Sequence, residues 1–147
     1  MVIAVLNGPN LNLLGSREPD VYGTTTLGDV ERLVRGRAEA LGVDIEWRQT
    51  NHEGAFVEMV QELSGTADGA LVNAAAFTHT SVAIRDALLA VNVPFVEVHL
   101  SNIFAREEAR RRSVLADLAV GLVVGFGPRS YVLGLEALVA HVRDRGV

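Results

Sequence analysis

The sequence predicts a doubly wound α/β fold, a three-layer sandwich in which helices cover both faces of a five-stranded parallel sheet with strand order 2-1-3-4-5. Two observations support this prediction. Short apolar runs rich in β-branched residues alternate with segments of helical periodicity, as in parallel sheets sandwiched between helices. The chain has 147 residues, 49% of them hydrophobic, and no internal repeat or linker, so we expect a single domain over residues 1–147.

Five apolar runs are expected to form the strands. They occupy residues 2–6, 44–48, 70–73, 95–99 and 120–124. In a doubly wound sheet, ligands bind beyond the carboxyl ends of the strands, at the point where the strand order reverses. That point lies between the first and third strands here. The loops after the first, third and fourth strands are therefore expected to carry the functional residues.

Four segments have apolar residues at helical intervals of three or four. They cover about 27–41, 56–63, 82–91 and 131–142. Thr26 and Asp29 can form a capping pair before the first helix. Gly42 and Gly65 follow the first and second helices, where helices commonly end. The charged segment 103–115 is expected to form only a short helical turn.

Composition excludes several classes of protein. All 13 basic residues are arginine and cysteine is absent, which excludes disulfides, lysine Schiff-base chemistry and the phosphate loop that ends in Gly-Lys-Ser/Thr. The formal charge of −5 and the 5% aromatic content argue against a nucleic-acid partner. The histidines are too scattered to predict a metal site. No signal peptide or membrane-spanning run is evident, so we expect a cytoplasmic protein without membrane contact.

The loop after the first strand, residues 7–26, is far longer than the about two to six residues usual at this place. It contains Asn10, Arg17 and Tyr22, together with glycines at which it could turn or hinge. A long loop at the switch point is usually functional. A merely structural excursion is the alternative.

Polar residues also follow the third strand. Asn73 ends it, and His79 stands at the start of the next helix, where backbone N–H groups favour an oxygen-rich or anionic ligand. Thr80 and Ser81 are explained at least as well as helix caps. His79 is harder to dismiss, because capping does not need a histidine.

Two ionisable residues near the end of the fourth strand, Glu97 and His99, fall on one face of it. A carboxylate placed there can raise the proton affinity of the histidine and hold its ring for general acid catalysis. A buried structural pair is the alternative. His52, after the second strand, is interpreted with Asn51 and Glu53 as turn and cap chemistry, and the glycines of 125–127 as a turn.

Five segments together resemble the type II 3-dehydroquinate dehydratases. They are NGPNLNLLGSREPDVYG at 7–23, QTNHEG at 49–54, THTSVAIRDAL at 78–88, VEVHLSNIFARE at 96–107 and GFGPRSYVLGLEAL at 125–138. The similarity spans almost the whole chain, and the first, third and fourth segments are long and irregular, which argues against accidental agreement. The resemblance implies a flavodoxin-like fold, no cofactor, and a homododecamer built from four trimers.

The reaction that the resemblance implies is an anti elimination of water from 3-dehydroquinate to 3-dehydroshikimate through an enolate, in the shikimate pathway to aromatic amino acids. Tyr22 would be the base. A free phenol has a pKa near 10, and a guanidinium such as that of Arg17, about 4 Å away, would stabilise the phenolate by roughly 4 kcal/mol, on the order of three pKa units. Desolvation would oppose part of this shift.

The other implied roles also fall on residues of this sequence. Asn10 would stabilise the enolate oxygen through a bound water, and His99, oriented by Glu97, would protonate the departing hydroxyl. The residues implied to bind the substrate are Asn73, His79, Leu100, Ser101, Arg110 and, from the neighbouring subunit, Asp86. The chain departs from the family pattern at Ala74–Ala75, at Phe104 and at Ala109, which affects the packing of the site rather than the proposed catalytic residues.

Other functions compete with this interpretation. A phospho-receiver domain would need an acidic cluster after the first strand and a lysine after the fifth, and the chain has neither. A flavin carrier would usually flank its ring with aromatic residues, which are few near these loops. A non-catalytic binding module on the same scaffold would not need the proposed catalytic residues. A catabolic enzyme of quinate breakdown would use the same chemical step as the biosynthetic one.

Overall fold

The sheet of the computed structural model has five parallel strands. They are β1 (Val2–Asn7), β2 (Asp44–Gln49), β3 (Gly69–Asn73), β4 (Phe95–His99) and β5 (Gly121–Val124). The strand order is β2-β1-β3-β4-β5, as the sequence predicts. The structure describes residues 1–16, 20 and 23–145.

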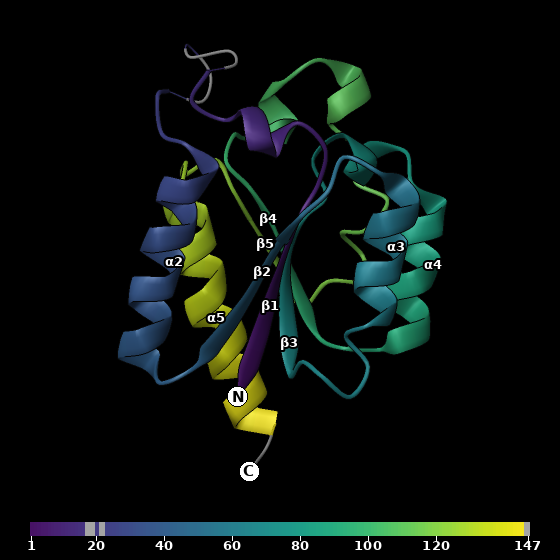
Figure 1. Ribbon diagram of the computed structural model, residues 1–147. Helices are drawn as coiled ribbons and strands as arrows, with labels where there is room; N and C mark the ends of the chain where they lie inside the picture. The colour runs from purple at the N-terminus through teal and green to yellow at the C-terminus, as the bar shows by residue number, and fades with distance from the viewer. Residues whose placement is uncertain (17–19, 21–22, 146–147) are drawn as a thin grey trace.

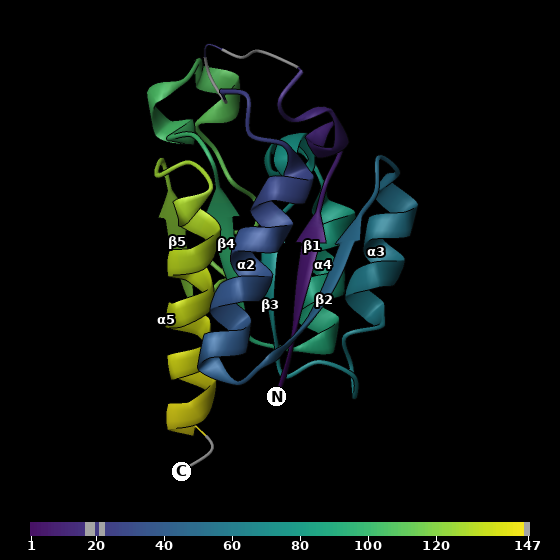
Figure 2. The same ribbon diagram turned by 60° about the vertical axis from the view of Figure 1, so that its left-hand side comes forward.

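Helices cover both faces of this sheet. On one face lie α2 (Leu27–Leu41) and α5 (Arg129–Arg145), and on the other lie α3 (Glu53–Gln61) and α4 (Val82–Val91), as Figures 1 and 2 show. Successive side chains of a strand point to opposite faces, so β1 contributes to both apolar cores. Its Ile3 and Val5 pack on the side of α2 and α5, whereas Ala4 and Leu6 pack on the side of α3 and α4. The predicted three-layer fold is confirmed.

Capping residues explain where two of the helices begin. Thr26 and Asp29 form the predicted capping box, because each side chain accepts a hydrogen bond from the backbone N–H of the other, at 3.1 and 2.9 Å. Gly42 ends α2 in the left-handed conformation, with φ 72°. Ser81 caps α4, since its Oγ accepts the backbone N–H of the residue three positions later at 3.0 Å.

The second helix begins and ends earlier than predicted. α3 ends at Gln61, so Leu63 lies in the following turn, where its N–H donates to the Val60 carbonyl at 3.0 Å. Leu63 is nevertheless buried, which explains why it continues the apolar pattern of the helix. Gly65, with φ 76°, therefore shapes a turn and does not end the helix.

Smaller differences occur in the second half of the chain. The segment 103–115 contains two 3₁₀ turns, η3 (Ile103–Ala105) and η4 (Glu108–Arg110), instead of one helical turn. Its charged residues offer no apolar stripe that could sustain a longer helix. β5 starts one residue later than predicted, and α5 starts two residues before Tyr131.

Two loops cross closely at the switch point of the sheet. The Gly8 N–H donates to the Asn73 carbonyl at 2.8 Å, and a Cβ on Gly8 would lie 2.3 Å from the Ala74 carbonyl oxygen. Only glycine fits at this crossing. Just beyond it, Ala75 has φ 51°, a left-handed conformation that costs an L-residue roughly 1–2 kcal/mol. The departure at Ala74–Ala75 thus places an alanine where the backbone favours glycine.

Replacing this strained alanine is expected to stabilise the protein. Ala75→Gly should raise the free energy of unfolding by about 0.5–1 kcal/mol, because glycine accepts the positive φ but loses more chain entropy on folding. Ala74→Gly is the matched control. Ala74 is buried with φ −77°, so that variant should be destabilised by about 1 kcal/mol. Thermal unfolding measures both, and Tm shifts of the same sign would refute strain at Ala75.

Candidate active site

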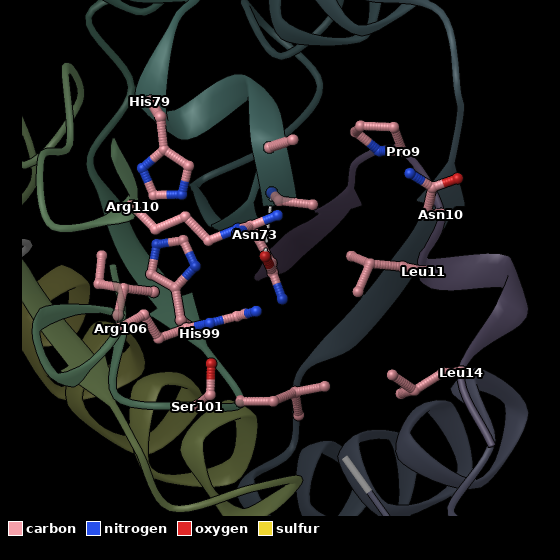
Figure 3. Close-up of a pocket in the computed structure, with 14 residues that line it drawn as sticks. Pro9, Asn10, Leu11, Leu14, Asn73, His79, His99, Ser101, Arg106 and Arg110 are labelled. Carbon is pink, nitrogen blue, oxygen red and sulfur yellow. Dashed lines mark hydrogen bonds between the residues drawn. The ribbon is translucent and has the colours of Figure 1, made fainter. Parts of the chain in front are cut away.

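A pocket lies at the carboxyl ends of β1, β3 and β4, where the fold predicts a ligand site. The predicted residues that line it are Asn10, Asn73, His79, His99, Leu100, Ser101 and Arg110 (Figure 3). They come from the last residues of β3 and β4, from the loops after the first, third and fourth strands, and from η4. The structure therefore brings together most of the site residues that the sequence predicts.

The pair at the end of β4 is organised as expected for a positioned acid. His99 Nε2 lies 2.9 Å from Glu97 Oε2, and both residues are buried, with Glu97 fully so. Glu97 does not line the pocket, whereas His99 does. The hydrogen bond to Glu97 uses Nε2, so Nδ1 is the ring nitrogen left for a ligand.

A residue that sequence reasoning missed completes this pair. The Ser113 hydroxyl donates to Glu97 Oε1 at 2.7 Å. Ser113 Oγ also accepts the backbone N–H groups of Leu115 and Ala116, both at 3.1 Å. Ser113 lies 16 residues from Glu97 in the irregular segment after η4, so no periodicity in the sequence could have indicated the contact.

His79 is held from the same segment. Its Nδ1 lies 2.7 Å from the Arg112 carbonyl oxygen. Because a carbonyl can only accept, Nδ1 carries the proton in this contact, and Nε2 is the nitrogen available to the pocket. Figure 3 shows the His79 and His99 rings on the same side of the pocket, opposite Asn10.

The Asn73 side chain is fixed by a buried network. Its Nδ2 donates to the Tyr131 hydroxyl at 2.9 Å, and its Oδ1 accepts the Ala75 N–H at 3.1 Å. The Tyr131 hydroxyl donates in turn to Asn7 Oδ1 at 2.7 Å. Burial raises the pKa of Tyr131, and the hydrogen bond from Asn73 opposes only part of this. The second hydrogen of Asn73 Nδ2 is left for a ligand hydroxyl.

Asn10 takes an unusual backbone conformation at the edge of the pocket. It precedes η1 (Leu11–Leu13) with φ 68°, which asparagine tolerates better than most residues. Its N–H donates to Asn51 Oδ1 at 3.0 Å. The predicted cap position of His52 is confirmed, because His52 occupies the N-cap of α3, but its side chain makes no cap hydrogen bond. The Asn51 side chain holds Asn10 instead.

Positive charge dominates the described part of the pocket lining. Arg106 and Arg110 both extend guanidinium groups into it (Figure 3), and none of the described lining residues carries a carboxylate. Arg110 also pairs with the exposed Glu107. Arg106 was not among the predicted site residues, although it lies only four residues before Arg110, which was. Such a lining favours an anionic ligand.

The predicted turn at 125–127 supports the end of β4. Gly125 and Gly127 have positive φ values of 94° and 62°. The Gly127 N–H donates to the Leu100 carbonyl at 2.9 Å, and the Gly125 N–H donates to the His99 carbonyl at 3.3 Å. These bonds hold the backbone from which His99, Leu100 and Ser101 face the pocket.

Four predicted site residues are not among the described residues of this lining, and Glu97 is one of them. Arg17 and Tyr22 lie outside the described residues. Asp86 is described, but it is exposed on α4 and does not line the pocket of its own chain. The departures Phe104 and Ala109 are also exposed and lie outside the lining.

The described residues contain neither a membrane-spanning helix nor a cluster of metal ligands. In residues 1–16, 20 and 23–145, no helix is long and apolar enough to cross a membrane. The same part of the chain contains no group of three or more histidine or acidic side chains that could hold a metal ion.

Comparisons with known proteins agree with this geometry. The family model "Dehydroquinase class II" matches residues 1–139. A 3-dehydroquinate dehydratase of Trichodesmium erythraeum is 54% identical over 98% of this chain and 96% of its own length. A catabolic 3-dehydroquinase of Aspergillus clavatus is 52% identical over 97% and 95%. The crystal structure of type II dehydroquinase from Butyrivibrio crossotus superposes with a TM-score of 0.91 at 39% identity, over 94% of this chain and 97% of that one.

Proposed function

This chain belongs to the dehydroquinase class II family and has the hydro-lyase activity of a 3-dehydroquinate dehydratase, and we propose that its reaction takes place in the pocket described above. The observation that carries this proposal is His99, held by a buried carboxylate beside two arginines. We assign to Tyr22 the base, to His99 the acid, and to Asn10 the stabilisation of the enolate.

Substrate binding follows from the charge and hydrogen-bonding groups of the lining. Ser101 and the backbone N–H groups of Leu100 and Ser101 would take the substrate carboxylate, which Arg106 and Arg110 attract. Asn73 Nδ2 and His79 Nε2 are the groups left free for substrate hydroxyls by their bonds to the protein. Several fixed contacts on one small ring would orient it for elimination.

The elimination needs a base and an acid at different carbons of the ring. Tyr22, with its phenolate stabilised by Arg17, would take the proton beside the ketone, and the electrons would pass to the ketone oxygen. The dipole of Asn10, acting through a water, would stabilise the resulting enolate. His99 Nδ1 would then protonate the C1 hydroxyl as the C1–O bond breaks, and the enolate electrons would form the new double bond.

The direct test is the absorbance of the conjugated enone product. Adding 3-dehydroquinate to the purified protein should give steady absorbance growth without added metal, flavin or nucleotide. We expect the rate to survive a chelator and to survive borohydride, because the chain has no lysine with which to form an imine. Inactivation by borohydride only in the presence of substrate would contradict the enolate route.

Assembly completes the proposed site. We infer that the chain forms a homododecamer of four trimers, with Asp86 reaching the pocket of a neighbouring subunit. Asp86 lies on the outward face of α4 with the exposed Val82 and Leu89. An apolar helix face that carries one carboxylate suits contact with a second copy, whose pocket is rich in arginine.

Asp86→Ala is accordingly expected to raise KM by about tenfold, the effect of losing one charged hydrogen bond to the ligand. Asp144→Ala, which removes an exposed carboxylate near the end of α5, should leave KM unchanged. Steady-state kinetics give both values, and light scattering verifies that the assembly is intact. An unchanged KM for Asp86→Ala in an intact assembly would argue against a shared site.

The same reaction can serve either biosynthesis or the breakdown of quinate. Relatives described as 3-dehydroquinate dehydratase and as catabolic 3-dehydroquinase match at nearly the same identity, and the chemical step is common to both. We propose the biosynthetic shikimate role, in the cytoplasm. Neighbouring genes for other steps of aromatic biosynthesis would support it, and genes for quinate uptake and oxidation would contradict it.

A further inference from the structure

We propose that Ser113 is a positioning residue that acts through Glu97 to hold His99 with Nε2 toward the carboxylate and Nδ1 toward the pocket. The hydrogen bonds behind this inference are independent of the proposed function. Its kinetic test rests on that function. Ser113 itself does not line the pocket, so it makes no contact with the substrate.

The hydrogen bonds of Ser113 determine which atom accepts its hydroxyl proton. Its oxygen accepts two backbone N–H groups, from Leu115 and Ala116, which occupy both lone pairs of the hydroxyl. The hydroxyl proton is then directed to Glu97 Oε1, 2.7 Å away. Ser113 therefore acts as a donor to Glu97, and Oε1 must accept.

The orientation of Glu97 follows from this contact. With Oε1 fixed by Ser113, the second oxygen Oε2 faces His99 Nε2 at 2.9 Å. Glu97 is fully buried, so an incorrectly oriented carboxylate would have no solvent to replace a lost partner. A carboxylate that accepts at both oxygens keeps the Nε2 proton of His99 in place after Nδ1 has donated its own proton to the leaving hydroxyl.

Ser113 also ties this pair to the rest of the pocket. It follows Arg112, whose carbonyl fixes His79, and it precedes Val114, whose N–H donates to the Thr78 carbonyl at 2.9 Å. Arg85 anchors the other side of the segment through Val114 O at 2.8 Å and through the carboxylate of Asp117. One irregular segment thus orients both histidines of the pocket.

A double-mutant cycle separates positioning from a purely structural role. Ser113→Ala is expected to lower kcat about tenfold, the effect of one lost hydrogen bond to a charged group, while KM stays within about twofold. In a Glu97→Gln background the same substitution should change kcat by less than about twofold, because the residue through which Ser113 acts no longer presents a carboxylate. Ser113→Thr, which keeps the hydroxyl, should restore most of the rate.

The matched control is Asp117→Asn. It weakens the Arg85 anchor of the same segment without touching Glu97, so its effect on kcat should be the same in both backgrounds. Equal losses for Ser113→Ala in the two backgrounds would overturn the inference and leave the proposed function standing. A normal kcat for Glu97→Gln alone would instead refute the role of Glu97 in the proposed function.

Discussion

Tyr22→Phe is expected to lower kcat by about a thousandfold or more while the protein folds normally. The substitution removes only the hydroxyl oxygen, so it deletes the proposed proton acceptor and keeps the aromatic ring. KM should change little, because the base acts in the transition state and is not assigned a substrate-binding contact. Steady-state kinetics and circular dichroism on the same preparation measure both effects.

The described structure supports this choice of tyrosine by excluding the other one. The chain has two tyrosines. Tyr131 is fully buried, its hydroxyl already bonds Asn7 and Asn73, and burial raises the pKa of Tyr131 further from neutrality. A group so placed is a poor base, which leaves Tyr22 as the tyrosine able to accept a proton.

Arg17→Ala supplies the control for Tyr22. The base must be deprotonated to act, so kcat falls as pH drops through the pKa of Tyr22. A neighbouring guanidinium lowers the pKa of a phenol, and its removal should therefore move this acidic limb of the kcat–pH profile to higher pH. A Tyr22→Phe rate near that of the unmodified protein, or an acidic limb that Arg17→Ala leaves in place, would show that another group is the base.

The fold could be predicted from the sequence because its signals are local. β4 coincides with the apolar run that predicted it, and Thr26 caps α2 as its spacing to Asp29 indicates. The predicted end of α3 was wrong because buried apolar residues continue beyond the last helical residue. Leu63 continues the apolar pattern of α3 because it is buried, yet its backbone has already entered a turn.

Part of the candidate site could also be predicted from the sequence, and part could not. Asn73 and His99 could be located because the ends of parallel strands converge at one edge of a doubly wound sheet. The contacts that orient them could not, because Tyr131 and Ser113 reach the site from 58 and 16 residues away in sequence. Such contacts depend on how α5 and the segment after η4 pack against the sheet, and neither spacing nor residue type predicts that packing.

His99→Ala is expected to reduce kcat by about a hundredfold to ten-thousandfold, the usual contribution of a positioned general acid. The leaving hydroxyl would depart without its proton, whereas removal of the first proton by the base would still be possible. Exchange of that proton with solvent, followed by mass spectrometry of recovered 3-dehydroquinate, should therefore persist in the variant while product formation nearly stops. Loss of both processes to the same degree would contradict the assignment of His99 to the second step.

Two further variants keep this result interpretable. His99→Ala leaves the buried Glu97 without one of its two donors, which costs about 1–3 kcal/mol of stability. His99→Gln retains a donor for that carboxylate but cannot act as an acid, so it should fold better and be equally slow. His52→Ala should be nearly neutral, because His52 is exposed and makes no side-chain cap bond. Equal losses of activity in His52→Ala and His99→Gln would contradict the assignment. The hydrogen bond to Glu97 would then not identify His99 as the acid.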